Sequence, residues 1–168
     1  MEIKIHQCEN VSDLREIILA HYDLCLEDLE QLKKSELSDP WTCTHMESCI
    51  SILKDIKEKK EKILICGDYD CDGICATAIL CKAFEACQIE YGFYIPKRIE
   101  EGYGLHVDVL EKALLKGYRN IITVDNGVRS IEAMKFVKDH QMRLIISDHH
   151  TFEMDQIDCD CLIHPFLA

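Results

Sequence analysis

The chain has 168 residues, 48% of them hydrophobic, which is enough for one ordinary domain with a sizeable core. Its 19 Lys and Arg against 31 Asp and Glu give a net charge of −12, which argues against general nucleic-acid binding through bulk positive charge. A nucleic-acid enzyme is still compatible with this charge, because bound metal ions can reverse the local field. We recognise no signal peptide and no membrane-spanning apolar run, and therefore expect no membrane partner.

Residues 1–60 read as a helical N-terminal segment. Apolar residues at helical spacing predict one helix after Ser12, a second over 26–37 and a third over 46–56, with a break at Asp39-Pro40. The charged run 57–62 (KEKKEK) predicts a solvated helix end, because interleaved Glu residues halve the charge of any basic patch there. We place a domain boundary near residue 60, with a second domain over 61–168.

From Ile63 onward, apolar strands alternate with helical segments. The predicted strands are 63–66, 89–95, 120–124, 143–147 and 161–163, and the predicted helices are 74–87, 107–116 and 130–140. This alternation is typical of βαβ units. The sequence therefore predicts an α/β fold, a mostly parallel doubly wound sheet with helices on both faces.

The 11 cysteines fall mostly inside apolar segments, as Cys66, Cys75, Cys81 and Cys87 do. No Cys-x-x-Cys motif occurs, so the spacing predicts neither a zinc ribbon nor a redox pair. We expect small buried hydrophobic residues in a reducing compartment, and hence a cytoplasmic location.

Three aspartates at alternate positions, Asp68, Asp70 and Asp72, follow the first predicted strand. If the backbone stays extended, residues two apart share a side, so the three carboxylates converge. Close carboxylates repel one another unless a cation lies between them. The pattern therefore predicts a divalent metal site.

Other interpretations explain this motif less well. An EF-hand loop that begins at Asp68 needs Glu at its twelfth position, which is Ile79 here. An aspartate-nucleophile phosphatase does not require the third aspartate, Asp72. A solvated acidic turn does not explain alternating aspartates between an apolar strand and an apolar helix.

Two more strand ends carry polar groups: Asp125-Asn126-Gly127 and Asp148-His149-His150. Sites in open α/β sheets lie beyond the carboxyl ends of the strands, so these groups and the aspartates share one edge. Carboxylates with imidazoles suit a two-metal hydrolase and manganese-like ions. Because His149 and His150 alternate in extended chain, we expect one to bind metal and the other to face substrate or another shell.

The loop 96–106 (PKRIEEGYGLH) is a second candidate site. Arg98 could hold a phosphate bidentately and Tyr103 could stack on a base or sugar, with Lys97 and the glycines at 102 and 104 nearby. A plain solvated loop explains these residues equally well.

The motifs GDYDCDG, PKRIEEGYGL, ITVDNG and ISDHH, in this order, resemble the DHH phosphoesterase superfamily. Within it, the pattern is most similar to RecJ-type single-stranded-DNA-specific exonucleases, over essentially the whole chain. The resemblance implies a 5′-to-3′ exonuclease of DNA repair and recombination, which hydrolyses phosphodiesters without a covalent enzyme intermediate. It also implies two divalent metal ions, with Mn²⁺ preferred and Mg²⁺ as the alternative.

The resemblance also implies roles for individual residues. It assigns metal ligands to Asp68, Asp70, Asp72, Asp125, His149 and His150, all but Asp68 with a catalytic role, and gives Asp148 a supporting role. Substrate phosphate or base would meet Arg98, Tyr103 and Asn126. Single-stranded DNA is the implied partner, with a single-strand-binding protein and a helicase for the full-length enzyme.

The chain departs from this pattern in two ways. Cys71 stands where an aliphatic or small residue is usual, and we expect it to point away from the aspartates. RecJ-type enzymes also continue beyond the position of Ala168, with a further acidic motif and DNA-binding domains. We therefore expect a catalytic-core fragment with weak or no activity of its own. One alternative is a small-substrate DHH hydrolase that acts on short oligonucleotides or cyclic dinucleotides. The other is an inactive remnant that binds metal.

Overall fold

The computed structural model describes residues 10–22, 25–27, 39–97 and 102–167. It divides into two compact units, Met1–Ser38 and Asp39–Ala168. In the first unit, α1 spans Val11–His21, which confirms the predicted helix but not its start: Ser12 lies inside the helix, and its backbone N–H donates to Asn10 Oδ1. The second predicted helix, over 26–37, lies almost entirely outside the described residues.

The second unit is built on a five-stranded sheet in which every neighbouring pair is parallel. The strands are β1 (Ile63–Cys66), β2 (Tyr91–Tyr94), β3 (Asn120–Val124), β4 (Arg143–Ser147) and β5 (Cys161–Ile163). Their order in the sheet is β2-β1-β3-β4-β5. The chain thus leaves β1 toward one edge, then returns past it to build the rest of the sheet.

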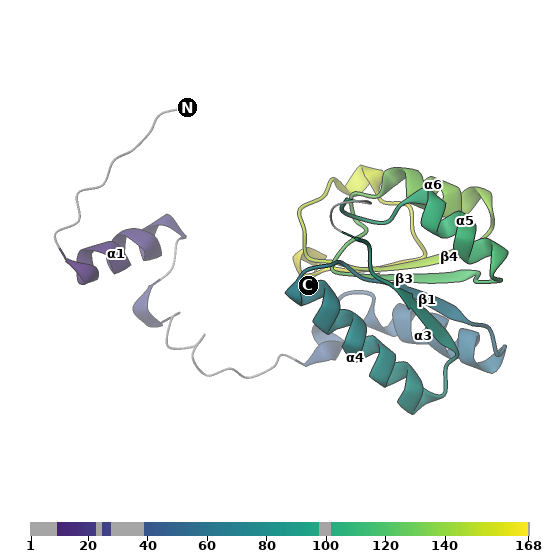
Figure 1. Cartoon of the computed structure of the whole chain (residues 1–168). Helices are drawn as coiled ribbons and strands as arrows, with labels where there is room; N and C mark the ends of the chain where they lie inside the picture. The colour runs from purple at the N-terminus through teal and green to yellow at the C-terminus, as the bar shows by residue number, and fades with distance from the viewer. Residues whose placement is uncertain (1–9, 23–24, 28–38, 98–101, 168) are drawn as a thin grey trace. The chain divides into compact units, whose positions relative to one another are not determined.

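Helices cover both faces of this sheet, as Figure 1 shows. On one face, α3 (Met46–Glu58) and α4 (Cys71–Cys87) pack around Ile56 and Phe84. On the other face, α5 (Val107–Leu115) and α6 (Ile131–Asp139) pack around Leu110 and Met134. The central strands β1 and β3 are buried along their whole length, which explains their uninterrupted apolar sequences. The predicted doubly wound α/β fold is confirmed.

Most element bounds agree with the sequence, and two differ in a way that matters. β2 is shorter than the predicted 89–95. α4 begins at Cys71, three residues before the predicted start, because the Asp70 side chain accepts a hydrogen bond from the Gly73 backbone N–H and caps the helix. By packing, α3 belongs to the sheet unit, since it contacts β5. The domain boundary near residue 60 stays a prediction.

The cysteines are less uniformly buried than the sequence indicates. Cys66 is buried in β1, but Cys75 and Cys87 are exposed on α4, and Cys81 is intermediate. The prediction was wrong for Cys75 and Cys87 because α4 buries one side only, through residues such as Thr77 and Phe84.

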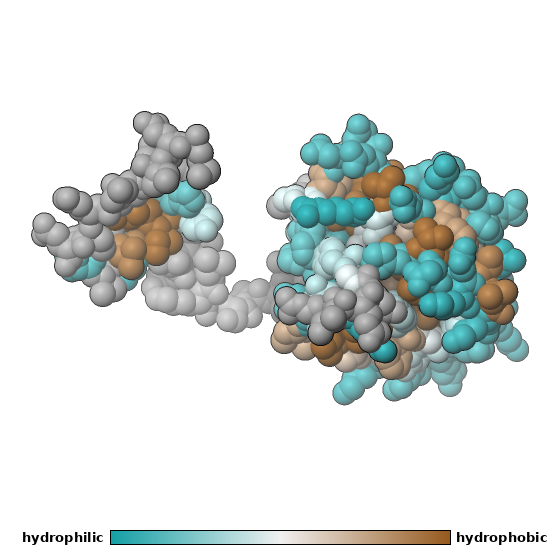
Figure 2. Space-filling view, turned by 45° about the horizontal axis from the view of Figure 1, so that its top comes forward, coloured by the Kyte–Doolittle hydropathy of each residue, from teal (hydrophilic) through white to brown (hydrophobic). Residues whose placement is uncertain are grey.

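On the face of the sheet unit in Figure 2, most residues are hydrophilic, with separate apolar patches. Within the described residues, no helix combines the length and hydropathy needed to cross a membrane.

Candidate metal centre

The candidate centre lies at the carboxyl ends of β1, β3 and β4. β1 and β3 are neighbours, yet the chain runs from β1 to β2 on one side and returns to β3 on the other. Such a reversal of strand order opens a crevice beyond the strand ends, where α/β proteins bind ligands. The polar residues after these three strands therefore meet at the switch point.

Asp68, Asp70 and Asp125 form the first cluster, with one carboxylate oxygen of each within 4.8 Å of the others. Asp68 is buried, at 3% exposure, directly after the end of β1. Asp70 is extended at the N-cap of α4 and accepts the Gly73 N–H at 3.0 Å. The third aspartate of the motif, Asp72, is absent from this cluster, which corrects the expectation of three converging carboxylates. The helix starts at Cys71, so the extended alternation ends at Asp70.

Two glycines allow α4 to start so close to β1. A Cβ atom at Gly73 would lie 2.6 Å from the backbone nitrogen and oxygen of Asp68, and one at Gly67 would lie 2.0 Å from Thr77 Oγ1. Thr77 in turn donates its hydroxyl to the Gly73 carbonyl at 2.8 Å. The first turn of α4 is thus packed against the end of β1, which holds Asp68 and Asp70 together.

Asp125 joins the β1 end to the β4 end. It has a left-handed backbone (φ 62°), which aspartate adopts more readily than most residues, and its side chain turns into the crevice with 8% of the residue exposed. Burial raises the pKa of Asp125, and the charge of Asp70 raises it further. The pKa of Asp70 is lowered, chiefly by the hydrogen bond from Gly73. Two carboxylates so placed favour a cation between them.

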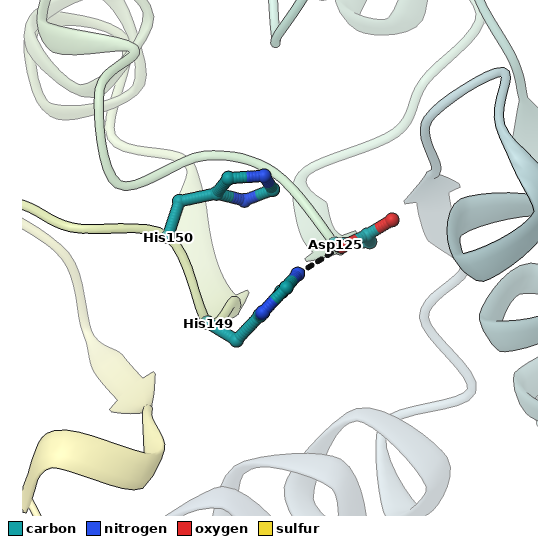
Figure 3. A group of neighbouring side chains, drawn as sticks. All are labelled: Asp125, His149 and His150. Carbon is teal, nitrogen blue, oxygen red and sulfur yellow. Dashed lines mark ion pairs between the residues drawn. The ribbon is translucent and has the colours of Figure 1, made fainter. Parts of the chain in front are cut away.

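The second cluster is Asp125, His149 and His150, whose ligand atoms also lie within 4.8 Å of one another. His149 Nε2 lies 3.0 Å from Asp125 Oδ1, the ion pair drawn in Figure 3. The two imidazole rings lie side by side, 4.5 Å between centroids. We expected them on opposite sides of an extended chain. Instead, β4 ends at Ser147, and the irregular backbone that follows, with a bend at His150, brings both rings near Asp125.

Asp148 lies buried behind His150, and its supporting role stays a prediction. Its side chain is 1% exposed, and its Oδ1 atom lies 2.7 Å from His150 Nδ1. The same oxygen accepts the backbone N–H groups of His149 and His150, while Oδ2 accepts that of Val128 at 3.1 Å. A carboxylate on Nδ1 orients the ring, and Nε2, which lies 3.3 Å from the Tyr103 hydroxyl, is the nitrogen that remains as a ligand.

The loop residues differ in where they lie. The Tyr103 hydroxyl is 3.0 Å from His150 Nδ1 and 3.3 Å from the Asp125 carbonyl, so the tyrosine borders the centre. Burial and the charges of Asp148, Asp68 and Asp125 raise the pKa of Tyr103 and keep the phenol protonated. Arg98 lies outside the described residues.

Asn126 lies at the same sheet edge, and its role as a substrate contact stays a prediction; its Oδ1 atom is buried and has no hydrogen-bond partner among the described residues. It is only 2% exposed, and its amide group donates to the carbonyls of Cys66 (3.1 Å) and Val124 (2.9 Å). It therefore ties the end of β1 to the end of β3. Its amide group thus links two neighbouring strands at the edge where the metal centre lies.

His164 is a positioning residue that the sequence did not assign to the site. It is 1% exposed, and its Nε2 atom lies 2.9 Å from the His150 carbonyl oxygen. The signal available in the sequence was a histidine immediately after the apolar strand 161–163, at the same sheet edge as the other polar groups.

The donor set fits a hard divalent cation. Asp68 Oδ1 and Asp125 Oδ2 are buried and have no hydrogen-bond partner among the described residues. Buried carboxylate oxygens without partners are costly, and a cation would satisfy them. Carboxylates with imidazole suit Mn²⁺ and similar ions. An open cleft of about 340 Å³, lined by Asp72, Asp125, Asp148 and His149 among others, gives access to the centre.

The family model described as "DHH family, N-terminal domain" matches residues 62–167. The chain belongs to the DHH family. All the strands and site residues described above lie within the matched range.

Relatives and a solved structure extend this likeness. The chain is 32% identical to the single-stranded-DNA-specific exonuclease RecJ of Bacillus subtilis over 79% of its own length and 17% of the relative. It is also 32% identical to RecJ of Haemophilus influenzae, over 84% of the chain and 24% of the relative. A crystal structure of exonuclease RecJ bound to manganese aligns with a TM-score of 0.69 and 27% identity, covering 79% of this chain and 34% of that one. The chain thus spans about a quarter or less of these curated relatives.

Proposed function

We propose that this chain carries the metal-binding part of a phosphodiesterase centre, and that the protein is a metal-dependent single-stranded-DNA exonuclease. The observation that carries the proposal is the shared position of Asp125. It belongs both to the aspartate cluster with Asp68 and Asp70 and to the histidine cluster with His149 and His150. One carboxylate between two ligand sets suits a pair of neighbouring metal ions.

Two divalent ions, Mn²⁺ preferred, would be held by Asp68, Asp70, Asp125, His149 and His150. Such ions, when bound, supply Lewis-acid polarisation of the phosphate and a lowered pKa for the attacking water. Asp72 lines the cleft but belongs to neither cluster. We propose that it binds metal only after a rearrangement, or that it contacts metal-bound groups rather than the ion itself.

The chain's own groups perform the orienting work. Asp148 fixes the ring of His150, and His164 fixes the backbone carbonyl of the same residue. Gly73 directs its N–H at Asp70 and keeps that carboxylate ionised at the edge of the crevice. The protonated Tyr103 hydroxyl stands beside His150, 40% of the residue exposed, where it can donate to a phosphate oxygen of a bound strand.

The substrate assignment is drawn from the relatives, which are named as single-stranded-DNA-specific exonucleases. We extend it to 5′-to-3′ polarity, to roles in DNA repair and recombination, and to a single-strand-binding protein and a helicase as partners. Arg98 is retained as the proposed phosphate contact. These proposals concern the whole protein, because the chain spans so little of its relatives.

The alternative proposals are hydrolysis of a small substrate and metal binding without turnover. Metal binding without turnover is supported by the net charge of −12 and by the acidic lining of the open cleft. Neither feature provides the positive charge that would hold a DNA strand. Substrate assays distinguish them: 5′-phosphorylated single-stranded DNA, a short oligonucleotide and a cyclic dinucleotide, each offered with Mn²⁺.

Metal titration tests the proposal most directly. We expect the 168-residue chain to bind Mn²⁺ in calorimetry, and Asp70→Ala and His149→Ala each to reduce that affinity strongly. The matched control is Asp108→Ala, which removes an exposed aspartate of α5 that belongs to neither cluster. This variant should bind Mn²⁺ as tightly as the parent chain. Unchanged binding in both Asp70→Ala and His149→Ala would refute the site.

A further inference from the structure

Two exposed cysteines lie one helical turn apart at the start of α4. Cys71 is the first residue of the helix and Cys75 follows four residues later, so both side chains project from the same face. Both are exposed free thiols. The two side chains are close enough to interact directly.

We propose that Cys71 and Cys75 form a bidentate site for a thiophilic metal ion, of the class of Zn²⁺, Cd²⁺ or a trivalent arsenical. The site lies beside the carboxylate centre and is chemically distinct from it. Sulfur ligands select soft ions, whereas carboxylates select Mn²⁺ and Mg²⁺. Neither cysteine belongs to the clusters around Asp125.

Helix geometry suits such a site. Residues four apart have Cβ atoms about 5–6 Å apart. Tetrahedral Zn–S bonds of about 2.3 Å need sulfur atoms about 3.8 Å apart, which rotation about χ1 achieves without moving the backbone. The ligands lose two protons to solvent when the ion binds. Solvent completes the coordination, because the helix face is open.

The surroundings attract a cation to this point. Two acidic residues, Asp70 and Asp72, flank Cys71 in the sequence and are exposed beside it. The other thiols offer less. Cys49, Cys66 and Cys161 are buried, and Cys87, although exposed on the same helix, lies at its opposite end. Among the described residues, the Cys71–Cys75 pair combines exposure with a second thiol one turn away.

Occupancy of this pair should affect the carboxylate centre. Cys71 is bonded to Asp70, whose side chain caps the helix at Gly73. A metal ion that clamps Cys71 to Cys75 fixes the first turn of α4 and brings positive charge next to Asp70. We therefore expect weaker Mn²⁺ binding when the thiol pair is loaded.

Phenylarsine oxide is a suitable probe, because it links two neighbouring thiols. Two S–H bonds break, two S–As bonds form, and the oxygen leaves as water, with arsenic trivalent throughout. By intact-mass spectrometry we expect one such adduct on the reduced 168-residue chain and on Cys87→Ser, the matched control on the same helix. Cys71→Ser and Cys75→Ser should each lose roughly 100-fold in affinity, because the second sulfur bond is no longer intramolecular.

Three results would overturn the site: no adduct on the parent chain, an adduct retained by both serine variants, or loss of the adduct in Cys87→Ser. Circular dichroism verifies that each variant is folded, and a serine variant that does not fold is replaced by alanine at the same position. A Cd²⁺ titration followed by thiolate-to-metal ultraviolet absorption provides a second readout. The adduct is measured without Mn²⁺, so failure of the proposed nuclease centre leaves this result unaffected.

Discussion

Gly73→Ala tests whether the close packing of α4 on β1 builds the aspartate cluster. Inside a helix, replacing Gly by Ala usually stabilises by about 1 kcal/mol, because glycine is the poorer helix former. At this position the new Cβ would lie 2.6 Å from the backbone nitrogen and oxygen of Asp68. Backbone atoms cannot rotate away, so the helix must move.

The required movement sets the magnitude. To restore ordinary contact at 3.4 Å, the first turn of α4 must retreat by about 0.8 Å from the end of β1. Overpacking of this kind costs about 1–3 kcal/mol, and the upper end applies because the Cβ atom has no rotatable bond and its neighbours are backbone atoms. After the gain in helix propensity, we expect a net loss of about 2 kcal/mol. The shift also separates Asp70 from Asp68, so Mn²⁺ affinity should fall roughly 10- to 100-fold, as for other disturbances of a metal site.

Urea unfolding and Mn²⁺ calorimetry measure the two effects separately. Ala78→Gly, at an exposed position of the same helix, is the matched control. It should cost about 1 kcal/mol through helix propensity and leave metal affinity unchanged. If Gly73→Ala is as stable as the parent and binds Mn²⁺ equally well, the proposed role of α4 packing in the site is refuted.

Three further predictions concern the shell of the site and the opposite end of the sheet. Asp148→Asn replaces a buried carboxylate that accepts backbone N–H groups with an amide. We expect urea unfolding to show a stability lower by about 1–3 kcal/mol, and calorimetry to show a clear loss of Mn²⁺ affinity. An unchanged Mn²⁺ affinity would contradict the orienting role of Asp148. Tyr103→Phe removes one hydroxyl from the edge of His150, so stability should fall by about 1 kcal/mol or less, with a smaller change in Mn²⁺ affinity than Asp148→Asn causes. The pKa of Asp55 is lowered from its ordinary 3.8, first by its hydrogen bond from Lys59. A carboxylate with a lowered pKa stabilises the fold only while it is ionised, that is, at pH values above that pKa. The parent should therefore melt at a higher temperature than Asp55→Asn near neutral pH, and this difference in melting temperature should vanish as the pH falls below the lowered pKa. A difference that stays constant with pH would contradict the prediction.

Much of the fold could be predicted because buried strands leave a local signature. β1, β3, β4 and β5 match the predicted ranges, since each is a short apolar run with a polar or glycine residue at its end. The same pattern indicated which residues reach the carboxyl edge of the sheet. It placed the aspartates after β1, Asp125 after β3 and the histidines after β4 on one side of the molecule.

The local conformation after each strand could not be predicted in the same way. Alternation suggested three converging aspartates, but capping by Asp70 starts α4 at Cys71 and leaves Asp72 outside the cluster. Alternation also predicted that His149 and His150 point to opposite sides, whereas the bend at His150 brings their rings together. In both places, hydrogen bonds to side chains override the extended backbone on which the period of two depends.

The sequence by itself determined the α/β class, the strands and the residues available at their ends, because these depend on local hydrophobic periodicity. Only the tertiary structure decided the strand order, which places β1 beside β3 and so brings Asp68 and Asp70 to Asp125. It also decided that Asn126 is a buried link and that Cys71 and Cys75 face solvent together. These outcomes depend on which surfaces pack against which, and that information is distributed over residues far apart in the chain.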